Sequence, residues 1–235
     1  MLKLVGLSKR FGALTVLQNL DLAVEAGEVL GVIGPNGAGK TTLFNIIAGV
    51  QSPSAGHVSI DERDITRMKV WDRCRLGIGR TYQVPKPFTH MSVFENVMVA
   101  AVHGGRMRIA AAKHEAQRVI EFTGLAHRLR LPAGQLSLLD LKRLELAKAL
   151  AQKPRLLLLD EIAGGLTEAE CDTLLEIVAR AREDGATIVW IEHVLHALRR
   201  IATRLAVLHG GAIIASGAPD AVLTDARVKE VYLGV

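Results

Sequence analysis

A glycine-rich segment between an apolar stretch and a helix is the feature that most constrains this fold. Residues 34–41 read GPNGAGKT and fit the pattern G-x-x-x-x-G-K-[ST] at every fixed position. The apolar run 29–33 before it predicts a strand, and the periodicity of 41–48 after it predicts a helix. A strand–loop–helix unit of this kind wraps backbone N–H groups around a phosphate, and the helix N-terminus adds a positive partial charge. The segment therefore predicts a nucleotide phosphate site.

Each residue of this loop has an expected role. Lys40 is placed to reach the β- and γ-phosphates of a nucleotide, and Thr41 to offer its hydroxyl to Mg²⁺. A glycine-rich turn without a ligand is the alternative, but the strand and helix on either side argue against it. The remaining contacts to the phosphates are assigned to Asn36, Gly37, Ala38, Gly39 and Thr42.

Two adjacent carboxylates follow a second apolar run. The run 156–159 predicts a buried strand, and Asp160 and Glu161 stand at its carboxyl end, where ligands bind in α/β sheets. Asp160 suits the ligand shell of Mg²⁺, and Glu161 can orient or polarise an attacking water. A strand ending at the surface would also carry acids, but the phosphate loop makes a nucleoside triphosphatase the better interpretation.

Composition excludes several other classes of protein. The chain has 235 residues, of which 49% are apolar and 23% charged, and this excludes disorder and coiled coil. The net charge, 29 − 24 = +5, is too small to indicate nucleic acid by itself. Cys74 and Cys171 are too few for a disulfide framework or a zinc cluster. No apolar run is long enough to span a membrane, and no secretory signal is visible, so we expect a soluble, intracellular globular protein.

The order of predicted elements indicates an α/β fold with a helical insertion. β-branched and leucine-rich runs predict strands at 14–24, 29–33, 58–60, 156–160, 187–191, 204–208 and 212–215. Helical periodicity is present at 41–48, 93–102, 109–122, 138–152, 168–182 and 193–201. Alternating strands and helices predict a mainly parallel sheet covered on both faces. We expect one domain over 1–235, with an α/β core of 1–84 and 153–235 and an inserted helical subdomain of 85–152.

Together with the residues between them, the two motifs resemble those of ATP-binding cassette (ABC) ATPases, the motor subunits of ABC transporters. The resemblance implies a phosphate-loop NTPase core, an antiparallel N-terminal β subdomain, and ATP and Mg²⁺ as ligands. It also implies that Phe11 stacks on adenine, that Gln83 contacts Mg²⁺ and water, and that His193 contacts the γ-phosphate. Read alone, Phe11 is a core residue, Gln83 a loop residue, and His193 with His196 a helix-capping or metal-binding pair.

Three segments are similar to branched-chain amino acid import ATPases, namely Gly79–Gln83, Met91–Val97 and Asp225–Gly234. This resemblance implies transmembrane permease subunits and a second ABC ATPase as partners, with a solute-binding protein acting indirectly. It also implies a peripheral position on the cytoplasmic face of the cell membrane. Urea importers and the lipopolysaccharide-export ATPase share much of the pattern and remain alternatives.

The segment Leu136–Asp140, called here the signature segment, departs from the LSGGQ sequence of that family because both glycines are missing. Ser137 remains, and Ser137-x-x-Asp140 is a capping-box pattern at the start of a predicted helix. We expect Ser137 to cap this helix while its hydroxyl stays available to nucleotide, with unpaired N–H groups at Leu138 and Leu139. The leucine side chains and the Asp140 charge should weaken the site. Because importers of this kind use two distinct ATPases, we expect a heterodimer, with a homodimer as the alternative.

Two smaller departures follow Glu161. Ile162 replaces the usual proline, and Thr167 stands where an acid or amide is typical, which bears on communication between subunits. Two other functions stay open: a soluble ABC protein acting on nucleic acid or ribosomes, and a non-hydrolysing ATP-binding regulator. A basic run is interpreted as a solvated face, and we expect no nucleic-acid partner; the run comprises Arg63, Arg67, Lys69, Arg73, Arg75 and Arg80.

Overall fold

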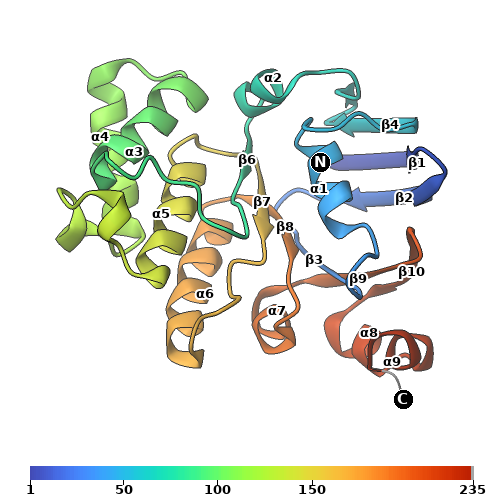
Figure 1. The fold of residues 1–235 in the computed structure, drawn as a ribbon. Coiled ribbons are helices and arrows are strands. Elements are labelled where there is room, and N and C mark those ends of the chain that lie inside the picture. Colours follow the sequence, from blue (N-terminus) through green and yellow to red (C-terminus); the bar gives the residue numbers. More distant parts are fainter. Residues whose placement is uncertain (234–235) are drawn as a thin grey trace.

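A six-stranded sheet lies at the centre of the computed structural model, which describes residues 1–233 (Figure 1). Its strands are β3 (Val29–Ile33), β6 (Ile78–Arg80), β7 (Leu156–Asp160), β8 (Thr187–Ile191), β9 (Arg204–His209) and β10 (Ala212–Gly217). Their order is β10-β9-β3-β8-β7-β6, and all neighbours are parallel except the edge pair β9 and β10. Every residue of β3, β7 and β8 is buried, as a parallel sheet covered on both faces requires.

A second, antiparallel sheet is formed mainly by the N-terminal part of the chain. It contains β1 (Leu2–Phe11), β2 (Leu14–Val24), β4 (Ala55–Ile60) and β5 (Arg63–Asp64), in the order β2-β1-β4-β5. Strand β1 is not among the strands predicted from the sequence. Its buried leucines break the strict alternation of a strand, because the register with β2 shifts between Leu4 and Leu7.

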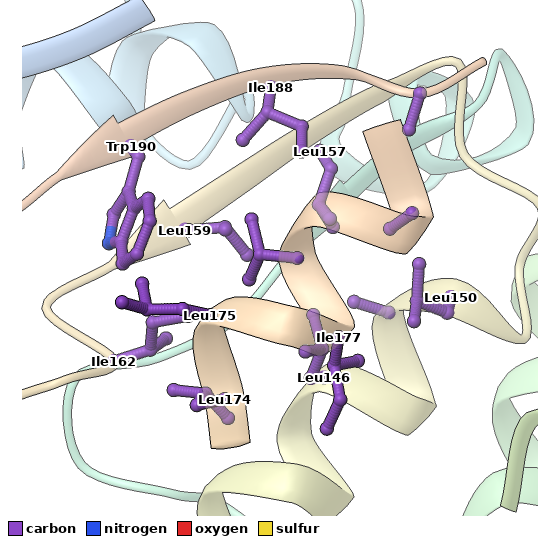
Figure 2. Close-up of a cluster of buried hydrophobic side chains, with 14 of the residues drawn as sticks. Leu146, Leu150, Leu157, Leu159, Ile162, Leu174, Leu175, Ile177, Ile188 and Trp190 are labelled. Atoms are coloured by element: carbon purple, nitrogen blue, oxygen red, sulfur yellow. The ribbon is translucent and has the colours of Figure 1, made fainter. Parts of the chain in front are cut away.

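Alternate side chains of the central strands enter two separate cores. Leu157 and Leu159 of β7 and Trp190 of β8 pack toward α6 (Glu168–Glu183), as Figure 2 shows. Leu156 and Leu158 enter the opposite core, with α1 (Lys40–Ile47) and the antiparallel sheet. This division follows from the two-residue period of a strand. The phosphate loop follows β3 and Asp160 ends β7, and these two strands lie in the same sheet with only β8 between them.

The middle of the chain is helical, as its periodicity predicts. Its elements are α3 (Val93–Val99), a π-helical turn η1 (Ala100–Gly104), α4 (Ile109–Phe122), short 3₁₀ helices η2 (Ala126–Arg128) and η3 (Ala133–Gln135), and α5 (Leu138–Leu150). The helix expected over 93–102 thus continues as a wider π turn beyond Val99. The division at residues 85 and 152 remains a proposal, supported by the absence of any named strand between Arg80 and Leu156.

The remaining helices are short and were mostly not predicted. They are α2 (Val70–Arg75), α7 (Leu195–Ile201), α8 (Pro219–Thr224) and α9 (Ala226–Leu233). Helix α7 begins two residues later than the expected start at His193. Helix α9 carries most of the C-terminal segment singled out in the sequence, whereas Gly234 lies outside the described residues. Within residues 1–233 no helix has the length and apolar character needed to cross a membrane.

Candidate active site

A cleft of about 810 Å³ opens over the loop between β3 and α1, at the carboxyl ends of the central strands. The loop and the start of α1, residues 34–42, form its floor. Gln83, Glu161 and His193 line another wall, and Leu14 and Val16 of β2 close the side. The structure thus brings residues from five separate segments to the edge where α/β sheets bind ligands.

Two glycines of the loop are required by space and backbone angle. A Cβ on Gly34 would lie 2.1 Å from the carbonyl oxygen of Leu208. Gly39 has φ +104°, and a Cβ there would lie 2.8 Å from the side chain of Leu17. Helix α1 begins directly after Gly39 with no side-chain cap. Its first N–H groups are therefore free to donate to an anion.

Lys40 is folded over the loop. Its Nζ donates to the carbonyl oxygens of Gly34 at 2.7 Å and Pro35 at 3.0 Å. Burial lowers the pKa of Lys40, and the nearby carboxylates of Glu161 and Asp160 oppose that shift. The ammonium is a mobile point charge on a flexible stem, so it can exchange these carbonyls for phosphate oxygens without backbone movement.

Glu161 is the point where the catalytic candidates converge. Gln83 Nε2 donates to Glu161 Oε2 at 2.6 Å, and His193 Nδ1 lies 3.7 Å from the same oxygen. Helix α7 has Val194 as its N-cap and no side-chain cap hydrogen bond, so the interpretation of His193 and His196 as a helix-capping pair is wrong. Within the described residues there is also no group of three or more His, Cys, Asp or Glu side chains that could hold a metal.

The backbone at Glu161 is strained and held from two sides. Its φ is +46°, in the left-handed region that non-glycine residues rarely adopt. Its N–H donates to Ile191 O at 2.9 Å, and Lys142 Nζ of α5 donates to its carbonyl oxygen at 3.2 Å. This strained backbone is therefore held in place by β8 and by α5, the helix that begins within the signature segment.

A fully buried carboxylate supports this turn from behind. Glu192 accepts from the N–H of Ala163 at 3.0 Å and from that of His193 at 3.1 Å. Burial raises the pKa of Glu192, and these backbone hydrogen bonds oppose the shift. Burial also lowers the pKa of Lys142, against the attraction of Glu192 and Glu161. No role of Glu192 or Lys142 could be predicted from the sequence, because nothing in their spacing marks one.

The oxygens around Asp160 fit a hard divalent cation such as Mg²⁺. Gln83 binds Glu161 through its nitrogen, which leaves Gln83 Oε1 unengaged by that bond. Asp160 engages Arg80 through Oδ2, and its Oδ1 accepts no hydrogen bond within residues 1–233. Thr41 is exposed at the start of α1. A site with one carboxylate is typical of Mg²⁺ held together with substrate phosphates.

Phe11 lies at the end of β1 and is 46% exposed, so the core interpretation of this residue is wrong. It pairs across the hairpin with Leu14, which lines the cleft, although Phe11 itself does not. Lys9 Nζ lies 4.9 Å from the centre of its ring. One ring face is therefore engaged by a cation at the rim of the cleft, and stacking on adenine stays a prediction.

The signature segment meets only half of the capping-box expectation. Ser137 Oγ accepts from Asp140 N at 3.2 Å, so Ser137 does cap α5. The Asp140 carboxylate turns away from the cap, to Arg143 Nη1 at 3.3 Å and Arg128 Nε at 3.5 Å. The like charge expected beside ATP is thereby neutralised within the chain. Leu138 is 45% exposed and would crowd an approaching anion.

The basic run is not uniformly solvated, which corrects the sequence interpretation. Arg63, Arg67, Lys69 and Arg75 are exposed, but Arg73 is 1% exposed and donates to main-chain carbonyls of α1. Arg80 is largely buried, with its side chain 10% exposed. Charge counting along a sequence does not distinguish a solvated arginine from one that holds an interior carbonyl or carboxylate.

The chain matches a family model described as "ABC transporter" over residues 17–164. Residues 212–235 match a second model, described as "Branched-chain amino acid ATP-binding cassette transporter". The chain is 33% identical to the high-affinity branched-chain amino acid transport ATP-binding protein LivG of Salmonella typhimurium, over 100% of this chain and 98% of that protein. It is also 33% identical to the lipopolysaccharide export system ATP-binding protein LptB of Escherichia coli K12, over 97% and 95%.

Solved structures agree with these sequence similarities. A nucleotide-free ATP-binding cassette from an ABC transporter superposes with a TM-score of 0.91 at 29% identity, over 100% of this chain and 99% of that one. The ADP conformation of the ATP-binding cassette MJ1267 superposes with a TM-score of 0.90 at 30% identity, with the same coverage. The architecture with two sheets and a helical region is therefore shared along the entire chain.

Proposed function

Because the chain belongs to the ABC transporter family, we propose that it powers the import of branched-chain amino acids. As a member of that family it is an ATP-binding transporter subunit and an ATPase. The match of residues 212–235 to the branched-chain model and the likeness to LivG favour amino-acid import. Lipopolysaccharide export is the second candidate, because LptB is as similar to this chain as LivG is.

We assign the chemistry to the groups that meet at Glu161. The bond from Gln83 and the approach of His193 to one oxygen of Glu161, beside the phosphate loop, carry this proposal. Glu161 orients the attacking water, His193 contacts the γ-phosphate, and Lys40 neutralises the phosphate oxygens. Water attacks the γ-phosphorus and gives up a proton to Glu161, while the bond from the γ-phosphorus to the β–γ bridging oxygen breaks and ADP and phosphate leave. Mg²⁺ held by Thr41, Asp160 and Gln83 would supply further charge neutralisation.

The loop that carries Gln83 is the proposed contact with the membrane subunits. Tyr82, Val84 and Phe88 are all exposed there, and Val84 is 71% exposed. An apolar helix of a permease fits this surface, and its movement would reach Glu161 through Gln83. The proposal therefore includes a subunit bound to its permeases on the cytoplasmic face of the membrane.

The same reasoning favours a heterodimer with unequal sites. In this family the nucleotide lies between one subunit's phosphate loop and the signature of the other. Here the phosphate loop is complete, whereas the signature segment has the exposed Leu138 in place of a small residue. A second cassette with a glycine-containing signature would complete the site built on Lys40. The site that uses this chain's own signature segment would be the weaker one.

Reconstitution tests both parts of the proposal. The chain is co-purified with its permeases and partner ATPase, placed in proteoliposomes with a solute-binding protein, and supplied with ATP. We expect uptake of radiolabelled leucine that Lys40→Ala abolishes, and only partial loss from the matching lysine change in the partner. If lipopolysaccharide is released and leucine is not taken up, the proposed import is rejected in favour of export. Equal loss from the two lysine variants would contradict the unequal sites.

A further inference from the structure

Arg80 joins three parts of the site that are far apart in the sequence. It is the last residue of β6, and three residues later the chain reaches Gln83. Its Nη2 donates to Asp160 Oδ2 at 2.9 Å, and its Nη1 donates to Asn45 Oδ1 at 2.7 Å. Asn45 belongs to α1, the helix that opens at the phosphate loop. One guanidinium therefore connects the helix of the phosphate loop to the carboxylate at the end of β7.

This contact is buried and directional. The Arg80 side chain is 10% exposed and that of Asp160 is 7% exposed. The third donor, Arg80 Nε, is buried without a hydrogen-bond partner in residues 1–233. A buried donor without a partner costs free energy. The guanidinium nevertheless keeps the orientation in which Nη1 and Nη2 reach Asn45 and Asp160 and Nε reaches no acceptor.

The backbone around the pair is tied as well. Asp160 N donates to Thr81 Oγ1 at 3.1 Å, and Thr81 N donates to Leu158 O at 2.9 Å. Asp160 is thus held through its main chain by Thr81 and through its carboxylate by Arg80. Only the carboxylate oxygen Oδ2 accepts a hydrogen bond within residues 1–233, so Oδ1 stays available to a further partner.

We infer that Arg80 is a positioning residue that orients the Asp160 carboxylate for a divalent cation bound with nucleotide. The inference rests on the proposed function, since it requires nucleotide and Mg²⁺ in the cleft. Mg²⁺ demands near-ideal octahedral geometry, so a ligand that can rotate is a poor ligand. Groups that hydrogen-bond a metal ligand commonly change metal affinity by 10- to 100-fold when they are replaced.

Charge and geometry can be separated by substitution. Arg80→Lys keeps the positive charge but loses the planar fork that reaches two acceptors from two nitrogens. Asn45→Ala keeps the arginine and removes its anchor on α1. Arg204→Lys is the matched control, because Arg204 bridges Glu28 and Ser216 at the start of β9, at the opposite end of the sheet from the cleft.

The readout is the dissociation constant of the non-hydrolysable analogue AMP-PNP, measured by calorimetry in Mg²⁺ and in EDTA. The dissociation constant in EDTA divided by the dissociation constant in Mg²⁺ reports how much Mg²⁺ tightens binding. We expect Arg80→Lys to lower this ratio roughly tenfold and Asn45→Ala to lower it in the same direction by a few-fold, with little change in EDTA. Arg204→Lys should leave the ratio unchanged, and thermal unfolding checks that each variant is folded.

An unchanged ratio in folded Arg80→Lys and Asn45→Ala overturns the inference, and if Arg80→Lys does not fold, Asn45→Ala decides. An equal fall in Arg204→Lys also overturns it, because the effect would then be general. Failure of the wild-type chain to bind AMP-PNP in either buffer would instead reject the proposed function, so the two failures are distinguishable.

Discussion

The Asp140–Arg143 pair offers a test of how this chain tolerates an acid in its signature segment. Arg143→Gln removes the closer of the two cations that neutralise Asp140. The side chains of Asp140 and Arg143 are 8% and 14% exposed, and their charged atoms lie 3.3 Å apart. At an effective dielectric constant of about 20, the Coulomb attraction at this distance is roughly 5 kcal/mol.

The measurable effect is smaller than that attraction. Both groups lose hydration on burial, and Arg128 still pairs with the same carboxylate at 3.5 Å. We therefore expect Arg143→Gln to lower the free energy of unfolding by about 2 kcal/mol, between the values typical of surface and buried pairs. In the Arg143→Gln background only Arg128 still compensates the Asp140 charge, so Asp140→Asn in that background should restore most of the loss.

A double-mutant cycle in urea measures this coupling directly. The four chains are wild type, the two single variants Asp140→Asn and Arg143→Gln, and the double variant. We expect a coupling energy of about 1–2 kcal/mol, within the range for residues in contact. In the assembled transporter, Arg143→Gln should also slow ATP turnover, and Asp140→Asn should restore it. Two results would refute the neutralisation of Asp140 by Arg143. One is that the two substitutions have additive effects on stability, and the other is that Asp140→Asn does not change the turnover of Arg143→Gln.

Substitutions at three further positions test the site. Glu161→Gln should preserve ATP binding and lower turnover of the assembled complex by about two orders of magnitude, as loss of a general base does; near-normal turnover would move that role to another group. Phe11→Ala should weaken ATP binding by about 1 kcal/mol and Phe11→Tyr much less, as a titration with each variant would show; equal affinity in all three chains would remove the stacking role. Because burial raises the pKa of Glu192, its protonation stabilises the fold at acid pH and that contribution is lost as the pH rises. The free energy of unfolding of Glu192→Gln, relative to that of wild type, should therefore rise as the pH is raised from 4 to 7.5 in urea titrations. A difference that falls with pH would contradict this.

Local sequence determined the parts of this protein whose physics is local. The phosphate loop could be predicted because glycines, a lysine and a threonine at fixed spacing lie between a strand and a helix that their own periodicity defines. The buried strands β3, β7 and β8 could be predicted from continuous apolar runs for the same reason. Ser137 was correctly expected to cap α5, since a cap depends on residues within one turn.

Tertiary structure alone decided which distant groups meet. Arg80 and Asp160 are 80 residues apart and become partners only because β6 lies beside β7. The Asp140 charge was expected to weaken the signature segment, but Arg128 of η2 helps to neutralise it. Strand β1 escaped prediction because its irregular register is set by pairing with β2 and β4. Burial and strand order depend on how distant segments pair in the assembled sheets, so the spacing of residues within one segment does not predict them.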